Sequence, residues 1–193
     1  MKTDIVLAGV GGQGVLSMAA LLTEAARSEG LHVKEAEVHG MAQRGGSVQA
    51  TLRISSEPIA SELIPRGRAR MIIGLEPVEA LRYLDYLAPD GVLLTAAEPF
   101  ENIPDYPPIE DVHERVRLVG GHLVEARRLA REAGSPRSIN VVMIGAASTR
   151  LPLRPETIER CLRDAFATKG ERIVGANVRA FRLGRDSLAF VSG

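Results

Sequence analysis

The 193-residue chain contains one cysteine, Cys161, and no tryptophan. A single cysteine excludes an intramolecular disulfide, and it cannot by itself hold an iron–sulfur cluster or a zinc ion. It also indicates a reducing compartment. Cys161 has the spacing of a core-facing helix residue relative to Ile158 and Ala165. We therefore expect a buried structural thiol at this position, and no nucleophile.

The chain also lacks an excess of charge of either sign, because its acidic and basic residues balance to a formal net charge of zero. Nonspecific binding to nucleic acid or to an anionic membrane needs a basic excess, so we expect neither partner. No apolar run approaches the roughly 20 residues of a membrane span. The first residues, Met1 to Asp4, lead directly into an apolar run and have no signal-peptide pattern. These features predict a soluble cytoplasmic protein.

The order of apolar patterns predicts the fold class. Short continuous apolar runs at residues 5–8, 70–75 and 92–97 are typical of strands buried on both faces of a sheet. Alternating patterns predict further strands, at 32–38, 47–55 and 115–121. Helical patterns occur at 15–28, 77–91, 122–135, 139–149, 155–166 and 173–184, and the proline-rich segment 99–108 predicts a loop. We predict an α/β fold, a three-layer Rossmann-like sandwich with a mainly parallel or mixed sheet, in one domain over residues 1–193.

The segment between the first predicted strand and the first predicted helix, "GVGGQG", fits the pattern G-x-G-x-x-G. Glycines there permit a tight turn, and the helix N-terminus offers unpaired N–H groups to a phosphate. One hypothesis is dinucleotide binding, with Glu35 or Glu37 as the ribose-binding acid. The other is a tight turn needed only for helix–sheet packing. The additional glycine and the polar glutamine favour a ligand other than NAD. The cofactor-binding candidates are Gly11, Gly12, Gln13 and Gly14.

A second motif, "EVHGMAQRGG", follows the second predicted strand. Ligands and partners of open α/β sheets bind at this carboxyl edge. A methionine suits an adaptable contact surface, and an arginine beside two glycines can approach an anion or a partner closely. The alternatives are a solvated turn and an RNA-binding arginine–glycine segment, which a single copy supports only weakly. The candidates for contact with a partner or substrate are His39, Gly40, Met41, Gln43, Arg44, Gly45 and Gly46.

The sequence offers no catalytic residue and no metal site. His32, His113 and His122 lie in separate segments without metal-ligand spacing, and they receive no role. There is no G-x-S-x-G elbow, no Walker lysine and no pair of catalytic carboxylates. Nothing in the sequence therefore identifies an active site that could work without a partner.

Two blocks together, "AGVGGQGV" and "EVHGMAQRGGSVQATLR", resemble the γ-type domain of the 2-oxoacid:ferredoxin oxidoreductases. The wording "HGMAQRGGSV" is most similar to the β subunits of the indolepyruvate enzymes of that family. The length and the segment "GANVRAFRLG" suit the same subunit.

The resemblance implies a subunit that bears no cofactor of its own. In such complexes an arylpyruvate is oxidatively decarboxylated to an acyl-coenzyme A, and electrons pass to ferredoxin. Thiamine diphosphate and the iron–sulfur clusters are then carried by a large α subunit. The two motifs would line a shared surface against that subunit and contact coenzyme A or substrate. Arg44 would be the anion contact.

Two other hypotheses remain beside this one. The chain could be a self-sufficient dinucleotide-binding oxidoreductase, which would gain thermal stability with NAD(H), NADP(H) or FAD. It could also be a stand-alone binding or regulatory module. In the absence of a partner, exposed sheet edges or apolar patches would allow it to form a homodimer.

Overall fold

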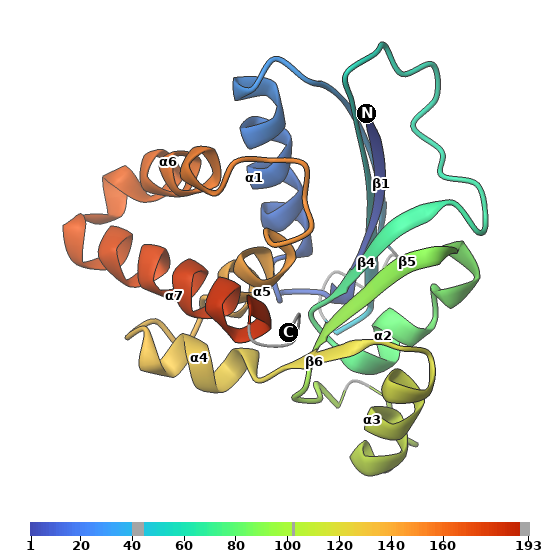
Figure 1. The fold of residues 1–193 in the computed structure, drawn as a ribbon. Helices are drawn as coiled ribbons and strands as arrows, with labels where there is room; N and C mark the ends of the chain where they lie inside the picture. Colours follow the sequence, from blue (N-terminus) through green and yellow to red (C-terminus); the bar gives the residue numbers. More distant parts are fainter. Residues whose placement is uncertain (40–44, 102, 190–193) are drawn as a thin grey trace.

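A six-stranded sheet lies at the centre of the computed structural model (Figure 1). The structure describes residues 1–39, 45–101 and 103–189, without the side chains of residues 38, 39 and 189. The strands are β1 (Lys2–Val10), β2 (His32–His39), β3 (Ser47–Ser55), β4 (Ala69–Gly74), β5 (Leu87–Ala96) and β6 (His122–Val124). The helices are α1 (Val15–Ser28), α2 (Pro77–Leu81), α3 (Ile109–Leu118), α4 (Ala126–Glu132), α5 (Ile139–Ala147), α6 (Pro155–Phe166) and α7 (Glu171–Ala189), with 3-10 turns η1 (Leu84–Tyr86) and η2 (Ala167–Lys169).

The strand order is β2-β3-β1-β4-β5-β6. Strands β1, β4, β5 and β6 pair in parallel, whereas β3 pairs antiparallel with both β1 and β2. The prediction of a mainly parallel or mixed sheet is confirmed. Because β3 reverses direction, β2 and β1 run the same way with β3 between them. The motifs that follow β1 and β2 therefore begin at the same edge of the sheet.

Helices cover both faces of the sheet and make the three layers seen in Figure 1. Helices α1, α4, α5, α6 and α7 lie over one face, and α2 and α3 lie over the other. Successive residues of β4 alternate between the two cores: Met71 and Ile73 face the larger helical layer, and Ile72 faces the smaller one. Burial on both faces explains why this strand has a continuous apolar sequence. No helix in the described part of the chain is long and apolar enough to cross a membrane.

The predictions for individual elements are partly confirmed. Helices α1 and α6 have the predicted bounds, and the predicted segment 173–184 lies inside α7. The single helix predicted over 77–91 is wrong, because α2 ends at Leu81 and β5 already begins at Leu87. The strand predicted over 115–121 is also wrong, because α3 occupies most of that segment. The helix predicted over 122–135 is wrong at its beginning, where residues 122–124 form strand β6.

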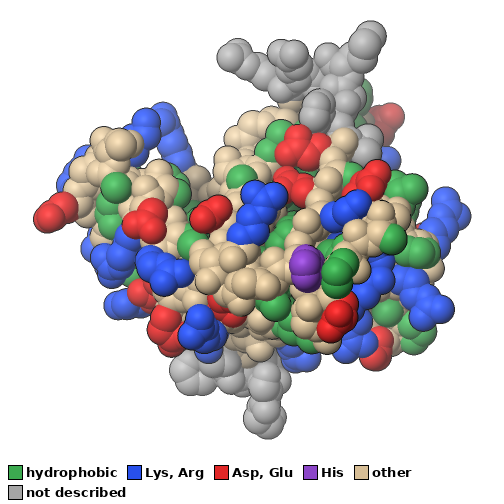
Figure 2. Space-filling view, turned by 90° about the horizontal axis from the view of Figure 1, so that it is seen from above, with side chains coloured by type: hydrophobic (Ala, Val, Ile, Leu, Met, Phe, Trp, Pro, Cys, Tyr) green, Lys and Arg blue, Asp and Glu red, His purple; other side chains and the backbone are tan. Residues whose placement is uncertain are grey.

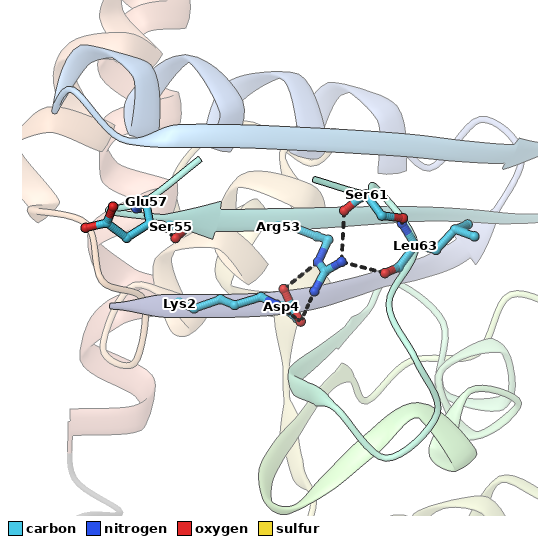
Figure 3. Close-up of polar contacts among 7 residues, drawn as sticks. All are labelled: Lys2, Asp4, Arg53, Ser55, Glu57, Ser61 and Leu63. Atoms are coloured by element: carbon cyan, nitrogen blue, oxygen red, sulfur yellow. Dashed lines mark hydrogen bonds and ion pairs between the residues drawn. The ribbon is translucent and has the colours of Figure 1, made fainter. Parts of the chain in front are cut away.

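A buried arginine organises the amino edge of the sheet (Figure 3). Arg53 on β3 donates from Nε and Nη2 to the two carboxylate oxygens of Asp4 on β1, both at 2.9 Å. Its Nη1 donates to the carbonyl oxygens of Ser61 and Leu63, at 2.8 and 2.6 Å. The side chains of Arg53 and Asp4 are 8% and 7% exposed. One guanidinium therefore joins two strands and holds the long segment that follows β3 against them.

Helices α5 and α7 approach each other closely at two glycines. A Cβ atom on Gly145 would lie 2.0 Å from the carbonyl oxygen of Phe181, and one on Gly184 would lie 2.0 Å from the carbonyl oxygen of Val142. Both obstacles are backbone atoms, which cannot rotate away. The two glycines therefore set the distance between the helices.

Candidate functional site

The glycine-rich turn lies at the carboxyl edge of the sheet, between β1 and α1. Gly14 precedes the helix with φ 93° and ψ 29°, a left-handed conformation that glycine adopts without strain. Gly12 has φ 99°, and a Cβ atom there would meet no atom of the described residues within 4 Å. None of these residues therefore blocks a ligand at Gly12. Among the described residues no side chain caps α1, and its first turn has no acidic residue, so none of these side chains competes with an anion for the first N–H groups.

Gln13 acts inside the turn. Its Oε1 accepts a hydrogen bond from the Val10 N–H at 2.8 Å, and its Nε2 donates to the Leu75 carbonyl at 3.1 Å. A Cβ atom at Gly9 would lie 2.9 Å from that Oε1. A larger residue at position 9 would therefore clash with the Gln13 side chain. The Gln13 side chain joins the ends of β1 and β4. The polar residue that the sequence singled out shapes the loop through these bonds.

The two motifs meet through their backbones. The Gly11 N–H donates to the Gly46 carbonyl at 2.8 Å. Gly45 beside it has φ 79°, and β2 ends at His39 on the same edge. The remaining candidates of the second motif, Gly40, Met41, Gln43 and Arg44, lie outside the described residues, as does the side chain of His39. The two motifs therefore contact each other at this edge through Gly11 and Gly46.

The acids expected for a dinucleotide ribose do not lie beside the turn. Glu35 belongs to the edge strand β2, which pairs with β3 and not with β1. Two strand spacings of about 4.8 Å separate β2 from β1, whereas the dinucleotide fold has these strands as neighbours. Glu35 instead accepts a hydrogen bond from Thr23 Oγ1 on α1, at 2.9 Å. Glu37 lies on the same edge strand. This topology disfavours the dinucleotide hypothesis.

Buried carboxyl groups at the same edge were not identified from the sequence. Glu76 follows β4 and is fully buried; its Oε2 accepts from the Glu79 N–H at 2.7 Å, and its Oε1 accepts from the Tyr106 hydroxyl. Burial raises the pKa of Glu76, and the two hydrogen bonds partly oppose this rise. Burial and the neighbouring Glu76 carboxylate raise the pKa of Tyr106. Tyr106 thereby fastens the proline-rich segment to the end of β4.

Two further carboxylates at this edge each leave one oxygen without a hydrogen-bond partner among the described residues. Glu79 Oε1 lies 3.4 Å from Arg82 Nε, while its Oε2 is buried and unpaired. Glu98 follows β5; its Oε1 accepts from the Arg127 N–H at 3.0 Å, and its Oε2 is unpaired. Their position in the sequence could have identified Glu76 and Glu98 as candidates. Each comes two residues after the end of a largely buried strand, where ligands of such sheets bind.

The raised pKa of Glu76 predicts a specific pH dependence of stability. Above its ordinary pKa near 4.5 the unfolded chain loses the Glu76 proton, while the folded chain keeps it until its own higher pKa is reached. The contribution of Glu76 to the free energy of unfolding should therefore fall as pH rises through that interval, by about 1.4 kcal/mol per pKa unit. Urea unfolding of wild type and Glu76→Gln from pH 4 to 8 measures it. A difference between the two proteins that does not change with pH would contradict the prediction.

The described residues contain no group of three or more His, Cys, Asp or Glu side chains arranged to hold a metal ion.

Cys161 is 5% exposed on α6, with its sulfur 3.6 Å from Ser28 Oγ. Its predicted burial is confirmed. The Nε2 of His113 lies 2.7 Å from the Ala97 carbonyl, and because a carbonyl only accepts, this nitrogen carries the proton. His113 thus serves to fix the segment after β5.

The family model for the pyruvate ferredoxin/flavodoxin oxidoreductases matches residues 4–187. The chain belongs to this family. A curated family relative, the indolepyruvate oxidoreductase subunit IorB of Thermococcus kodakarensis, is 40% identical over 192 residues, which cover 94% of this chain and 93% of that protein. A second IorB subunit, from Archaeoglobus fulgidus, is 35% identical over 95% of this chain and 94% of its own length.

Solved structures show the same fold within the oxidoreductase family. The pyruvate oxidoreductase subunit PORC of Thermotoga maritima has a TM-score of 0.71 and 25% identity, covering 96% of each chain. The 2-oxoglutarate:ferredoxin oxidoreductase of Magnetococcus marinus, solved with 2-oxoglutarate, coenzyme A and succinyl-CoA bound, has a TM-score of 0.78 and 23% identity. This chain is covered completely there, but it spans only 32% of the Magnetococcus chain. The fold therefore occurs both as a separate subunit and within a longer polypeptide.

Proposed function

We propose that the chain is the small subunit of a ferredoxin-dependent 2-oxoacid oxidoreductase, which oxidatively decarboxylates indolepyruvate and other arylpyruvates to acyl-coenzyme A. The observation that carries this proposal is the 40% identity to an indolepyruvate oxidoreductase subunit over nearly the whole length of both proteins. The chain acts as a single γ-type domain over residues 1–193. It works as part of the enzyme complex and is not active alone.

Membership of the family supports our proposal for the cofactors and the main partner. A large α subunit carries thiamine diphosphate and the iron–sulfur clusters, and ferredoxin receives the electrons from that subunit. The single cysteine of this chain supports the assignment of the clusters to the α subunit, because one buried cysteine cannot ligate a cluster. A reduced cysteine also supports a cytoplasmic location for the complex.

The shared edge formed by Gly11–Gly14 and residues 39–46 is our proposed contact surface for the α subunit and for coenzyme A or substrate. This placement is supported by the hydrogen bond between Gly11 and Gly46, by the space that the described residues leave at Gly12, and by the α1 N-terminus, which none of their side chains caps. Arg44 would supply the positive charge that faces an anion, either a coenzyme A phosphate or a carboxylate of the partner.

Co-purification with the partner is the direct test of the proposed function. A tagged form of this chain, expressed in its native source, should retain a large polypeptide that binds thiamine diphosphate. The purified complex should reduce ferredoxin with indolepyruvate only when coenzyme A is present. Isolation of this chain alone, or a complex without that activity, would refute the proposal. The same measurements on the Arg44→Ala variant test the proposed role of Arg44. Unchanged assembly, activity and coenzyme A affinity in this variant would refute that role.

A substitution at Gly12 tests the proposed surface. Gly12→Asp should lower the affinity for coenzyme A or for the α subunit at least about tenfold, because it places a negative charge and a side chain where an anion would approach the α1 N-terminus. The measurements are the KM for coenzyme A and the amount of α subunit retained. Gly30→Asp is the matched control, since Gly30 also has positive φ and open space but lies beyond the other end of α1. Equal losses in both variants would indicate backbone strain and contradict the prediction.

A further inference from the structure

A hollow lies at the amino edge of the sheet, opposite the edge that carries the two glycine motifs. Its volume is about 310 Å³, at the lower end of the range of small-molecule sites. Strands β1, β3 and β4 and the segment that joins β3 to β4 contribute to it. The lining residues are Lys2, Asp4, Arg53, Pro65, Arg68 and Arg70. Among the described residues that line the hollow, four are therefore cationic and one is acidic.

Strand pairing brings these charges to one face of the sheet. Strands β1 and β4 pair in parallel, with Ile5 in register with Met71. The residues that precede these two, Asp4 and Arg70, therefore come level with each other where the strands begin. On the other side of β1, Asp4 is in register with Arg53 of β3. The carboxylate of Asp4 thus has an arginine on each neighbouring strand.

The Arg53–Asp4 pair forms a buried wall of the hollow (Figure 3). Its two side chains are 8% and 7% exposed. The guanidinium neutralises the carboxylate through two hydrogen bonds, so Asp4 repels an anion much less than a free carboxylate would. Arg53 Nη2 uses one hydrogen for Asp4, and its second hydrogen has no acceptor among the described residues. The wall therefore offers one further N–H to a ligand.

The other three cations surround this pair and are exposed. Arg68 has no carboxylate within ion-pair distance in the part of the chain that the structure describes. Lys2 Nζ lies 3.9 Å from Asp4 Oδ2, an oxygen that already accepts from the buried guanidinium. Arg70 has a partner of its own in Asp90. The positive charges of Lys2 and Arg68 thus remain largely uncompensated at the hollow.

This excess of positive charge is confined to the hollow. Figure 2 is seen from the top of Figure 1, where β1 begins, and shows acidic and basic side chains interspersed over that side of the molecule. The formal net charge of the chain is zero. Such a mixed surface does not favour a long polyanion. Two uncompensated cations beside a buried guanidinium favour a compact anion with two negative charges.

We propose that this hollow binds a compact dianion of the size of inorganic phosphate or sulfate, with Lys2, Arg53 and Arg68 as its contacts. Guanidinium and ammonium groups hold such oxyanions through charge-assisted hydrogen bonds. The bound ion joins the beginning of β1 to the segment between β3 and β4, because Lys2 belongs to the strand and Arg68 to the segment. The site lies opposite the proposed contact surface for the α subunit, and it does not depend on the proposed function.

Titration of the full chain with inorganic phosphate tests this proposal. Phosphate at low concentration, with the ionic strength held constant by sodium chloride, should raise the melting temperature until the effect saturates. Constant ionic strength removes changes in screening, and low concentration avoids the general stabilising effect of phosphate as a salt. The variant K2Q/R68Q should bind phosphate at least about tenfold more weakly. Its melting temperature without phosphate should stay close to that of the wild type, because both residues are exposed.

The matched control removes two charges elsewhere. Arg115 and Arg117 are exposed on α3 and do not line the hollow, so R115Q/R117Q should keep the phosphate affinity of the wild type. The absence of saturable binding by the wild type would overturn the proposal. Equal affinity of the wild type and K2Q/R68Q would also overturn it. Equal weakening in both double variants would do the same, because the effect would then reflect the total charge of the chain.

Two further measurements identify the ion and its position. Phosphate gains its second negative charge between about pH 6 and 8, whereas sulfate keeps both charges throughout. Phosphate binding should therefore strengthen over this range relative to sulfate binding, and a constant ratio of the two affinities would contradict recognition of a dianion. The ion that binds more tightly at pH 8 is assigned to the site. Bound ion should also protect the segment between β3 and β4 from proteases in the wild type but not in K2Q/R68Q, and equal protection in both would place the ion elsewhere.

Discussion

Replacing Arg53 with methionine is expected to lower the free energy of unfolding by about 3–5 kcal/mol, because it leaves a buried carboxylate without its partner. Asp4 is 7% exposed, and apart from Arg53 its ion-pair contact among the described residues is Lys2, at 3.9 Å. The same substitution removes both hydrogen bonds to the carbonyls of Ser61 and Leu63. The segment between β3 and β4 should therefore also become sensitive to proteases. Urea unfolding and limited proteolysis measure the two effects.

The control for this prediction has similar geometry at the surface. Arg182 also makes two bonds to one carboxylate, from Nε and Nη2 to Glu159 at 2.7 and 2.8 Å, but its side chain is 59% exposed. Arg182→Met should cost only about 0–1 kcal/mol. The double variant Asp4→Leu/Arg53→Met should recover part of the loss, because neither charge is then buried alone. If the Arg53 and Arg182 substitutions lower the free energy of unfolding by similar amounts, burial of the Arg53–Asp4 pair does not determine how much that pair stabilises the protein.

Alanine at Gly184 is expected to destabilise the protein by about 1–3 kcal/mol, although alanine is the better helix former. The added Cβ would lie 2.0 Å from the Val142 carbonyl oxygen, so α5 and α7 would have to separate by an ångström or more. Thermal unfolding should show a lower melting temperature for Gly184→Ala, and Gly145→Ala should behave similarly because it meets the Phe181 carbonyl in the same way.

Gly175 provides the matched control on the same helix. Its added Cβ would lie 3.6 Å from Arg179 Nη1, an ordinary contact with a flexible side chain. Gly175→Ala should therefore stabilise the protein by roughly 0.5–1 kcal/mol through helix propensity alone. A stabilising Gly184→Ala would mean that the two helices do not depend on the close approach at this glycine.

Regular local patterns allowed parts of the fold to be predicted. Helix α6 begins at Pro155 and has Ile158, Cys161 and Leu162 on its buried side, so both its start and its core face are visible in the sequence. The pattern Arg-Val-Arg-Leu-Val near residue 117 is ambiguous and favoured a strand. In the structure it belongs to a helix, where Val112 and Val116 share the buried face at a spacing of four residues.

Other features depend on contacts between distant segments and could not be predicted. The sequence identified the two glycine motifs and the edge at which they would meet, but not the position of β3 between β1 and β2. That pairing is what moves Glu35 away from the turn. Similarly, burial of Glu76 depends on Tyr106, which is brought to it by a proline-rich segment without a regular pattern. A carboxylate is expected to be solvated until the elements that cover it are known.

The position of β1 has a consequence for synthesis of the protein. This strand begins the chain, yet it lies between β3 and β4, which end at Ser55 and Gly74. At about 5–20 residues per second, the ribosome needs several seconds to make the segments that will flank it. During that time a strand buried from Asp4 onward in the finished fold has both edges free. The two edges of β1 can therefore pair only after both β3 and β4 have been synthesised.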